Sequence, residues 1–154
     1  MHTREEVAKV WLEKALREKD DFNKFISSWI AFNALYNRED KRYENQRIQS
    51  FMKHVSHKKY AVLLLDATYF YTPIRDLRPE HDGTTREHID VMIDNRIALG
   101  KRLGSLMLCI YQFRCNLFHG DKFLDDLRNQ ELAKESAKIL IKFLELYLGK
   151  PTTH

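Results

Sequence analysis

An apolar seam in the second half of the chain is the feature that most constrains its fold. Its members recur at steps of four, three, four, three and four residues: Leu99, Leu103, Leu106, Ile110, Phe113 and Leu117. Such spacing places one stripe of side chains along a helix against its neighbours, as in antiparallel helix packing. The segment therefore predicts a core helix of a helical bundle.

The remainder of the chain favours the same fold class. Only five Gly and three Pro occur in 154 residues, and this scarcity favours long helices over a turn-rich β fold. Further helices are predicted over residues 3–20, 22–36, within 43–67, from a capping box at 84–87, and over 124–148. Residues 68–83 lack this periodicity and read as a loop. Residues 1–154 are predicted to form a single all-α domain.

Composition sets limits on location and partners. The net charge of +4 permits a polyanionic partner, although Lys and Arg are spread along the whole chain. The amino terminus lacks the apolar core of a signal peptide, and no apolar run reaches the ~20 residues of a membrane span. Cys109 and Cys115 lie six positions apart on one predicted helix, on different faces, so a mutual disulfide is geometrically poor. We therefore expect reduced thiols and a cytoplasmic protein without membrane partners.

The residues with the greatest chemical potential lie where the seam ends. Arg114 flanks the seam, and a guanidinium there needs an acceptor, a dimer interface or an anion. His119 lies next to the expected helix stop at Gly120, where the carbonyl ends favour an imidazolium. Five positions on an ideal helix amount to roughly 140° of rotation and about 7.5 Å of rise. The two side chains therefore meet only if the last turn unwinds or a second subunit completes the site.

This pair resembles the Arg-x4–6-His signature of the HEPN superfamily. The residues around His119 (116–120) and the upstream aromatic segment 29–36 are similar to the ApeA-like branch, so the resemblance covers two motifs and the helical layout. It implies an up-and-down antiparallel bundle of four to five helices that forms a homodimer with two motifs facing across a cleft. It also implies a metal-independent endoribonuclease without cofactors, of the toxin or antiviral defence type, with RNA and an antitoxin or defence protein as partners.

The implied chemistry suits the two motif residues. His119 is able to take the proton of a ribose 2′-hydroxyl or to protonate the leaving oxygen, and Arg114 to hold the pentavalent phosphate in bidentate fashion. Asn116, Asn33 and Cys115 are the predicted supporting residues. The family commonly has a polar residue such as Asn directly after the Arg, where this chain has Cys115. The structural alternative is an Arg that closes a buried salt bridge and a His that caps a helix.

For the other candidate site residues, the sequence leaves two interpretations open. Asn33 lies on the apolar side of an aromatic helix, where its amide either supports Arg114 or substrate, or holds a helix pair or loop by a structural hydrogen bond. The residues predicted to contact RNA are Lys53, Lys58, Lys122, Tyr69 and Tyr71. Solvated lysines and aromatic packing over the bundle end are the alternatives. For the whole chain, the alternatives to catalysis are a non-catalytic HEPN domain that binds RNA, a nucleotide or a partner protein, and a structural dimerisation module.

Overall fold

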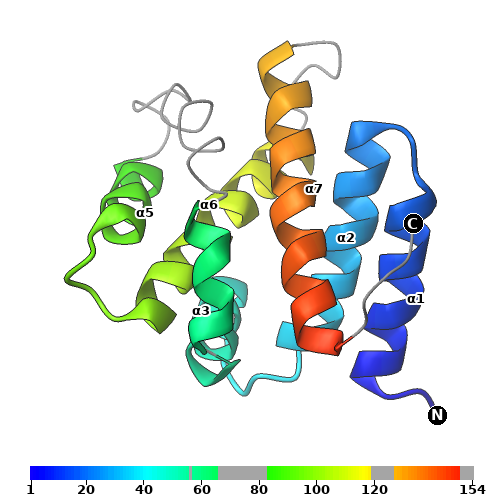
Figure 1. Cartoon of the computed structure of the whole chain (residues 1–154), viewed down its shortest axis with the longest axis horizontal. Coiled ribbons are helices and arrows are strands. Elements are labelled where there is room, and N and C mark those ends of the chain that lie inside the picture. Colours follow the sequence, from blue (N-terminus) through cyan, green and yellow to red (C-terminus); the bar gives the residue numbers. More distant parts are fainter. Residues whose placement is uncertain (56, 66–82, 119–126, 150–154) are drawn as a thin grey trace.

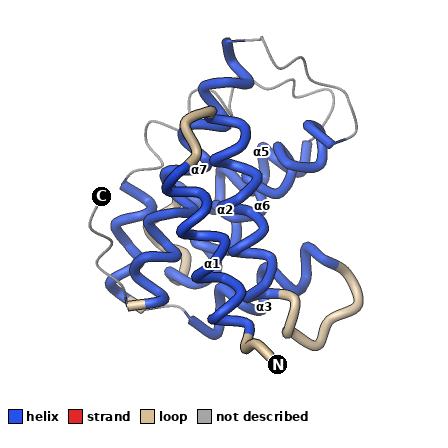
Figure 2. Tube along the Cα trace, turned by 90° about the vertical axis from the view of Figure 1, so that its right-hand side faces the viewer, coloured by secondary structure: helices blue, strands red, loops and turns tan. Residues whose placement is uncertain are grey.

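The computed structural model describes residues 1–55, 57–65, 83–118 and 127–149, and helices joined by short connections make up this part of the chain (Figure 1). The elements are α1 Arg4–Arg17, α2 Asp21–Tyr36, α3 Glu44–Val55, the 3-10 helix η1 Lys58–Ala61, α5 Gly83–Ile93, α6 Leu99–Phe118 and α7 Leu127–Leu148. Figure 2 shows no strand among these described residues. The predicted all-α helical bundle is confirmed.

Local side chains define the helix ends. The Thr3 hydroxyl accepts from the Glu6 amide (3.0 Å) and the Glu6 carboxylate accepts from the Thr3 amide (3.2 Å), which forms a capping box before α1. Gly149 follows α7 with a φ of 69°, a left-handed conformation that costs glycine little and ends the helix as the sequence predicted. Within the described part, no helix is both long and apolar enough to cross a membrane.

Two helices differ most from their predicted bounds. The helix expected within 43–67 ends at Val55, because His57 takes an extended backbone (φ −150°, ψ 154°) and its ring nitrogen caps the following 3-10 helix through the Lys59 amide. α5 begins at Gly83, so Thr84 lies inside its first turn. The predicted start of this helix at the capping box 84–87 is therefore wrong, because a capping residue precedes the helix. Residues 66–82, which include most of the expected loop, lie outside the described residues.

The bundle consists of two packed groups of helices joined by aromatic side chains. α1, α2 and α7 pack together, and α6 packs against both α3 and α5 (Figure 1). From α2, the Phe32 ring contacts Phe51 of α3 (6.1 Å between centroids) and Phe143 of α7 (5.7 Å). Phe25 contacts Phe113 of α6 at 5.2 Å. The predicted seam faces this core: Leu103, Leu106, Ile110 and Phe113 are fully buried, and Leu99 and Leu117 are partly buried against it.

The directions of the helices follow from which residues meet. A Cβ on Gly104 of α6 would lie 3.8 Å from the Gln49 Cα of α3, and Arg114 further along α6 contacts Glu44 further back on α3. α3 and α6 are therefore antiparallel. α7 runs in the same direction as α2, since the intervening helices return the chain to the end of the bundle where α2 begins (Figure 1).

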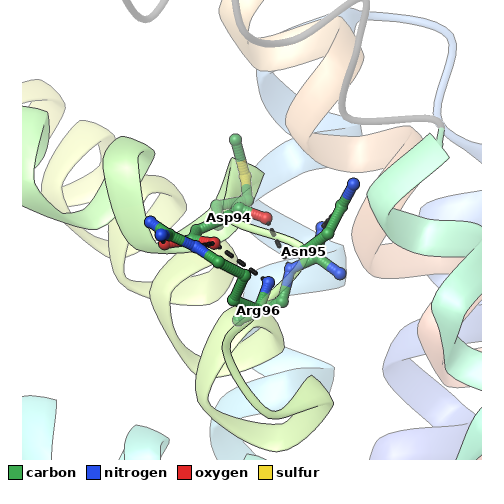
Figure 3. Close-up of polar contacts among 5 residues, drawn as sticks. Asp94, Asn95 and Arg96 are labelled. Carbon is green, nitrogen blue, oxygen red and sulfur yellow. Dashed lines mark hydrogen bonds and ion pairs between the residues drawn. The ribbon is translucent and has the colours of Figure 1, made fainter.

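A polar turn fixes the connection between α5 and α6 (Figure 3). The Asp94 carboxylate accepts from the Arg96 amide (2.9 Å) and from its guanidinium (3.0 Å to each oxygen). Arg102 of α6 reaches back, donating to the Met92 carbonyl (2.9 Å) and to the Asn95 side chain (3.3 Å). These hydrogen bonds pair polar backbone and side-chain groups of the turn with one another.

The Asp94 carboxyl is expected to titrate unusually low. Hydrogen bonds from the Arg96 guanidinium and amide lower its pKa to about 2. Because the folded pKa is depressed, the stabilisation is present above the unfolded value and is lost as the pH falls toward about 2. The effect on global stability is expected to be small, since the Arg96 side chain is 90% exposed. NMR titration should place the Asp94 midpoint near 2, and Arg96→Gln should raise it; an unchanged midpoint would refute this assignment.

Candidate active site

Arg114 lies in the last turns of α6, beside the buried seam residues Ile110 and Phe113. Its side chain is 26% exposed, and its Nη1 atom lies 3.7 Å from Oε1 of Glu44, whose side chain is 22% exposed. The sequence predicted that this guanidinium needs an acceptor, an interface or an anion, and Glu44 at the beginning of α3 is an acceptor. The ion pair therefore lies at the edge of the core, within reach of solvent.

Glu44 is itself held from α2. The Tyr36 hydroxyl donates a hydrogen bond to Glu44 Oε2, and the Asn33 amide donates to the Tyr36 oxygen (2.8 Å) and to the same Glu44 oxygen (3.4 Å). The Asn37 side-chain amide completes the row by donating to the side-chain oxygen Oδ1 of Asn33 at 3.1 Å. One carboxylate oxygen is thus fixed by α2 while the other faces Arg114. We call Asn33, Tyr36, Glu44 and Arg114 the arginine network.

The electrostatics of this network keep Tyr36 as a donor. Burial, and then the hydrogen bond to the Glu44 carboxylate, raise the pKa of Tyr36 far above its ordinary value, and the Asn33 hydrogen bond and the Arg114 charge oppose this only in part. The phenol therefore stays protonated throughout the physiological range. It can stabilise the ionised carboxylate of Glu44 without competing for its charge.

Two further motif residues make contacts along α6. Tyr111 stacks on Trp29 of α2 (6.1 Å between centroids, 28° between planes), and its hydroxyl interacts with the half-buried Cys115. Asn116 accepts a hydrogen bond from Gln112, one turn earlier, at 3.0 Å. Cys115 and Asn116 therefore contact residues of their own helix, whereas Arg114 reaches across to α3.

Two tyrosines, Tyr36 of the network and Tyr111 of α6, make the protein sensitive to alkaline pH. Burial, followed by the Cys115 interaction, raises the pKa of Tyr111 to about 12, and Tyr36 is shifted in the same direction. Because these folded values exceed the unfolded value of about 10, their stabilisation is complete below about pH 10 and is lost as the pH rises. The urea midpoint should therefore fall between pH 10 and 12. Tyr111→Phe should make this fall shallower, and an identical slope in both proteins would contradict the prediction.

The structure joins some of the sequence-predicted residues and leaves others apart. Asn33 donates to Glu44, which also contacts Arg114, so the structure shows a hydrogen bond between helices; a functional support of Arg114 stays a prediction. Lys53 is exposed but away from this site, since it lies nine positions after Glu44 on α3, or about 13.5 Å of helical rise. Lys58 is exposed on η1. Four predicted site residues lie outside the described residues: His119, Lys122, Tyr69 and Tyr71.

Glu44 and the Tyr36 hydroxyl are the site residues that sequence reasoning missed. Tyr36 ends the aromatic segment 29–36, and its ring is fully buried. The sequence indicated only that the Arg114 guanidinium needs a negatively charged partner. It did not show which of the 22 acidic residues is that partner. Among the described residues, no group of three His, Cys, Asp or Glu side chains is arranged to hold a metal ion.

Comparisons of the chain with protein-family models, with curated proteins and with solved structures find no match. The residues of this site and their chemistry therefore carry the functional proposal.

Proposed function

We propose that the protein is a metal-independent endoribonuclease with a HEPN-type site, in which Arg114 holds the scissile phosphate and His119 transfers protons. The observation that carries this proposal is the arginine network: a partly exposed guanidinium at the end of a core helix is oriented by a carboxylate that a buried tyrosine and an asparagine hold in place. Such preorganised cations stabilise charge that develops in a transition state.

In the proposed reaction, the ribose 2′-oxygen forms a bond to the adjacent phosphorus while the bond from phosphorus to the 5′-oxygen breaks. The 2′-hydroxyl proton goes to one imidazole, and the 5′-oxygen receives a proton from an imidazolium. The products are a 2′,3′-cyclic phosphate and a 5′-hydroxyl. Arg114 neutralises the extra charge of the pentavalent phosphate, and Glu44 keeps the guanidinium in position.

The proposal includes a homodimer. On an ideal helix the Arg114 and His119 side chains diverge by roughly 140°, so a second copy of the motif is the simplest way to supply one residue of each type at a shared phosphate. A cytoplasmic toxin or antiviral defence effector, with RNA as substrate and an antitoxin or defence protein as partner, is the biological setting that the HEPN resemblance implies.

A second candidate is a non-catalytic HEPN domain that binds RNA, a nucleotide or a partner protein. It is favoured by the contacts of Arg114 and Cys115: Glu44 already compensates the guanidinium charge, and Cys115, which replaces the polar residue usual in the family, faces Tyr111. Binding without catalysis would tolerate loss of His119 but not loss of the basic surface.

The experiment that tests the first candidate is incubation of the purified protein with a mixed RNA in EDTA. Cleavage that leaves cyclic-phosphate ends is expected, whereas DNA and 2′-O-methyl RNA should stay intact because they lack the nucleophilic hydroxyl. Intact RNA in this assay, at protein concentrations that bind it, would reject catalysis on general RNA and favour the binding domain.

A further inference from the structure

An exposed aromatic residue directly precedes Glu44 of the arginine network. Among the aromatic side chains that the structure describes, only Tyr43 is exposed, with 54% of its surface accessible. It directly precedes Glu44, so it shares the beginning of α3 with the Arg114–Glu44 ion pair. The other described rings contribute to the core or pack against it. Single exposed apolar groups are common on protein surfaces, so the charges beside this ring decide what it can bind.

One cation lies over this ring, and a second precedes it in the chain. The Arg42 guanidinium lies over the Tyr43 ring, 5.3 Å from its centroid, and both Lys41 and Arg42 are exposed. The segment is the connection between α2 and α3 at the lower end of the bundle in Figure 1. A ring face with basic side chains beside it complements a base joined to a phosphate.

The backbone of this segment is fixed. The Arg47 guanidinium donates to the Lys41 and Arg42 carbonyl oxygens (3.1 Å each), and the Arg47 amide donates to the Tyr43 carbonyl oxygen (3.0 Å). The ring therefore extends from an ordered turn. A preorganised contact surface loses less conformational entropy on binding than a mobile loop does.

We infer that Tyr43, with Arg42, is a stacking platform for one unpaired base next to the phosphate held by Arg114, so the substrate is single-stranded RNA. This inference rests on the proposed function. Bases expose their faces for stacking only where the strand is unpaired, whereas a duplex hides them between neighbouring pairs. Stacking on an aromatic ring tolerates any base, so the platform selects strandedness and not sequence.

The test uses the wild-type protein, Tyr43→Ala and Tyr43→Phe, with a short unpaired 2′-O-methyl RNA as a probe that cannot be cleaved. Fluorescence anisotropy should show that Tyr43→Ala weakens binding by about 5- to 100-fold, the usual cost of losing one aromatic stacking partner. Tyr43→Phe should bind like the wild type, since it keeps the ring. Val10→Ala is the matched control, because Val10 is 63% exposed on α1, which packs against α2 and α7.

Each result decides the inference. Unchanged affinity in Tyr43→Ala, an equal loss in Tyr43→Phe, or an equal loss for a duplex of the same sequence would overturn it, as would failure of the wild type to bind the unpaired probe. Circular dichroism should show that Tyr43→Ala folds, since the ring is exposed. The binding assay involves no cleavage, so a Tyr43 effect in a protein that does not cut RNA would reject the nuclease while the platform stands.

Discussion

Alanine at either motif position, Arg114 or His119, is expected to lower kcat/KM for RNA cleavage by at least about 100-fold. Loss of a preorganised donor to a developing oxyanion costs about 10²–10³ in rate, and loss of a general acid or base costs about 10²–10⁴. For Arg114 the loss should appear at saturating substrate as well, because the pentavalent phosphate carries more charge than the ground state. Initial rates on a defined oligonucleotide in EDTA measure both effects.

Two controls separate this catalytic role from a structural one. Arg114→Lys keeps the charge but loses the planar fork, so it should recover only part of the activity. Lys101→Ala removes an exposed cation from the first turn of the same helix and should cut RNA at the wild-type rate. If Arg114→Ala and His119→Ala retained wild-type activity, these two residues would not form the catalytic site. If Arg114→Ala lost activity only in proportion to unfolding, the dimerisation or stability role would be favoured.

Replacement of Phe32 by alanine is expected to lower the free energy of unfolding by about 3–5 kcal/mol, the typical cost of removing a fully buried phenylalanine. Phe32 is 0% exposed and contacts rings of two other helices, Phe51 of α3 and Phe143 of α7. A cavity at this position would weaken the junction between the two groups of helices, and few neighbours could move to fill it because each is fixed on a separate helix. Urea unfolding followed by circular dichroism measures the change.

Phe32→Leu is the matched variant and should recover much of the loss, because it keeps a large apolar side chain in the same place. A Phe32→Ala protein that lost less than about 1 kcal/mol would show that this ring is not central to the core. Because Tyr36 lies one turn further along α2 and packs on Phe32 at 5.1 Å, the alanine variant is also expected to loosen the arginine network.

The arginine network joins the core to the candidate site. The Tyr36 ring is fully buried, yet its hydroxyl donates a hydrogen bond to the Glu44 carboxylate, which contacts Arg114. The position of a partly exposed functional group is therefore set from the core through two hydrogen-bonding side chains. Variants that remove only the Tyr36 hydroxyl would separate the two roles, since Tyr36→Phe keeps the ring packing.

Much of the fold could be predicted from residue spacing. The steps of four and three from Leu99 to Leu117 require a helix with one buried face, and Leu103, Leu106 and Ile110 are buried as this pattern demands. The aromatic row of α2 was predicted on the same basis, and Gly149 ends α7 because glycine adopts a positive φ at little cost. The break near His57 was missed, because it depends on one local capping contact and not on a period.

The sequence by itself determined the fold class, since hydrophobic periodicity specifies which face of each helix is buried, and it identified Arg114 as a charge that needs a partner. Only the tertiary structure decided which partner: Glu44, 70 positions earlier, reaches it because α3 and α6 pack antiparallel, and Tyr36 and Asn33 reach the same carboxylate from α2. Periodicity describes a helix and its own neighbours along the chain. Contacts between helices depend on their order, direction and register, which the packing of the whole core sets.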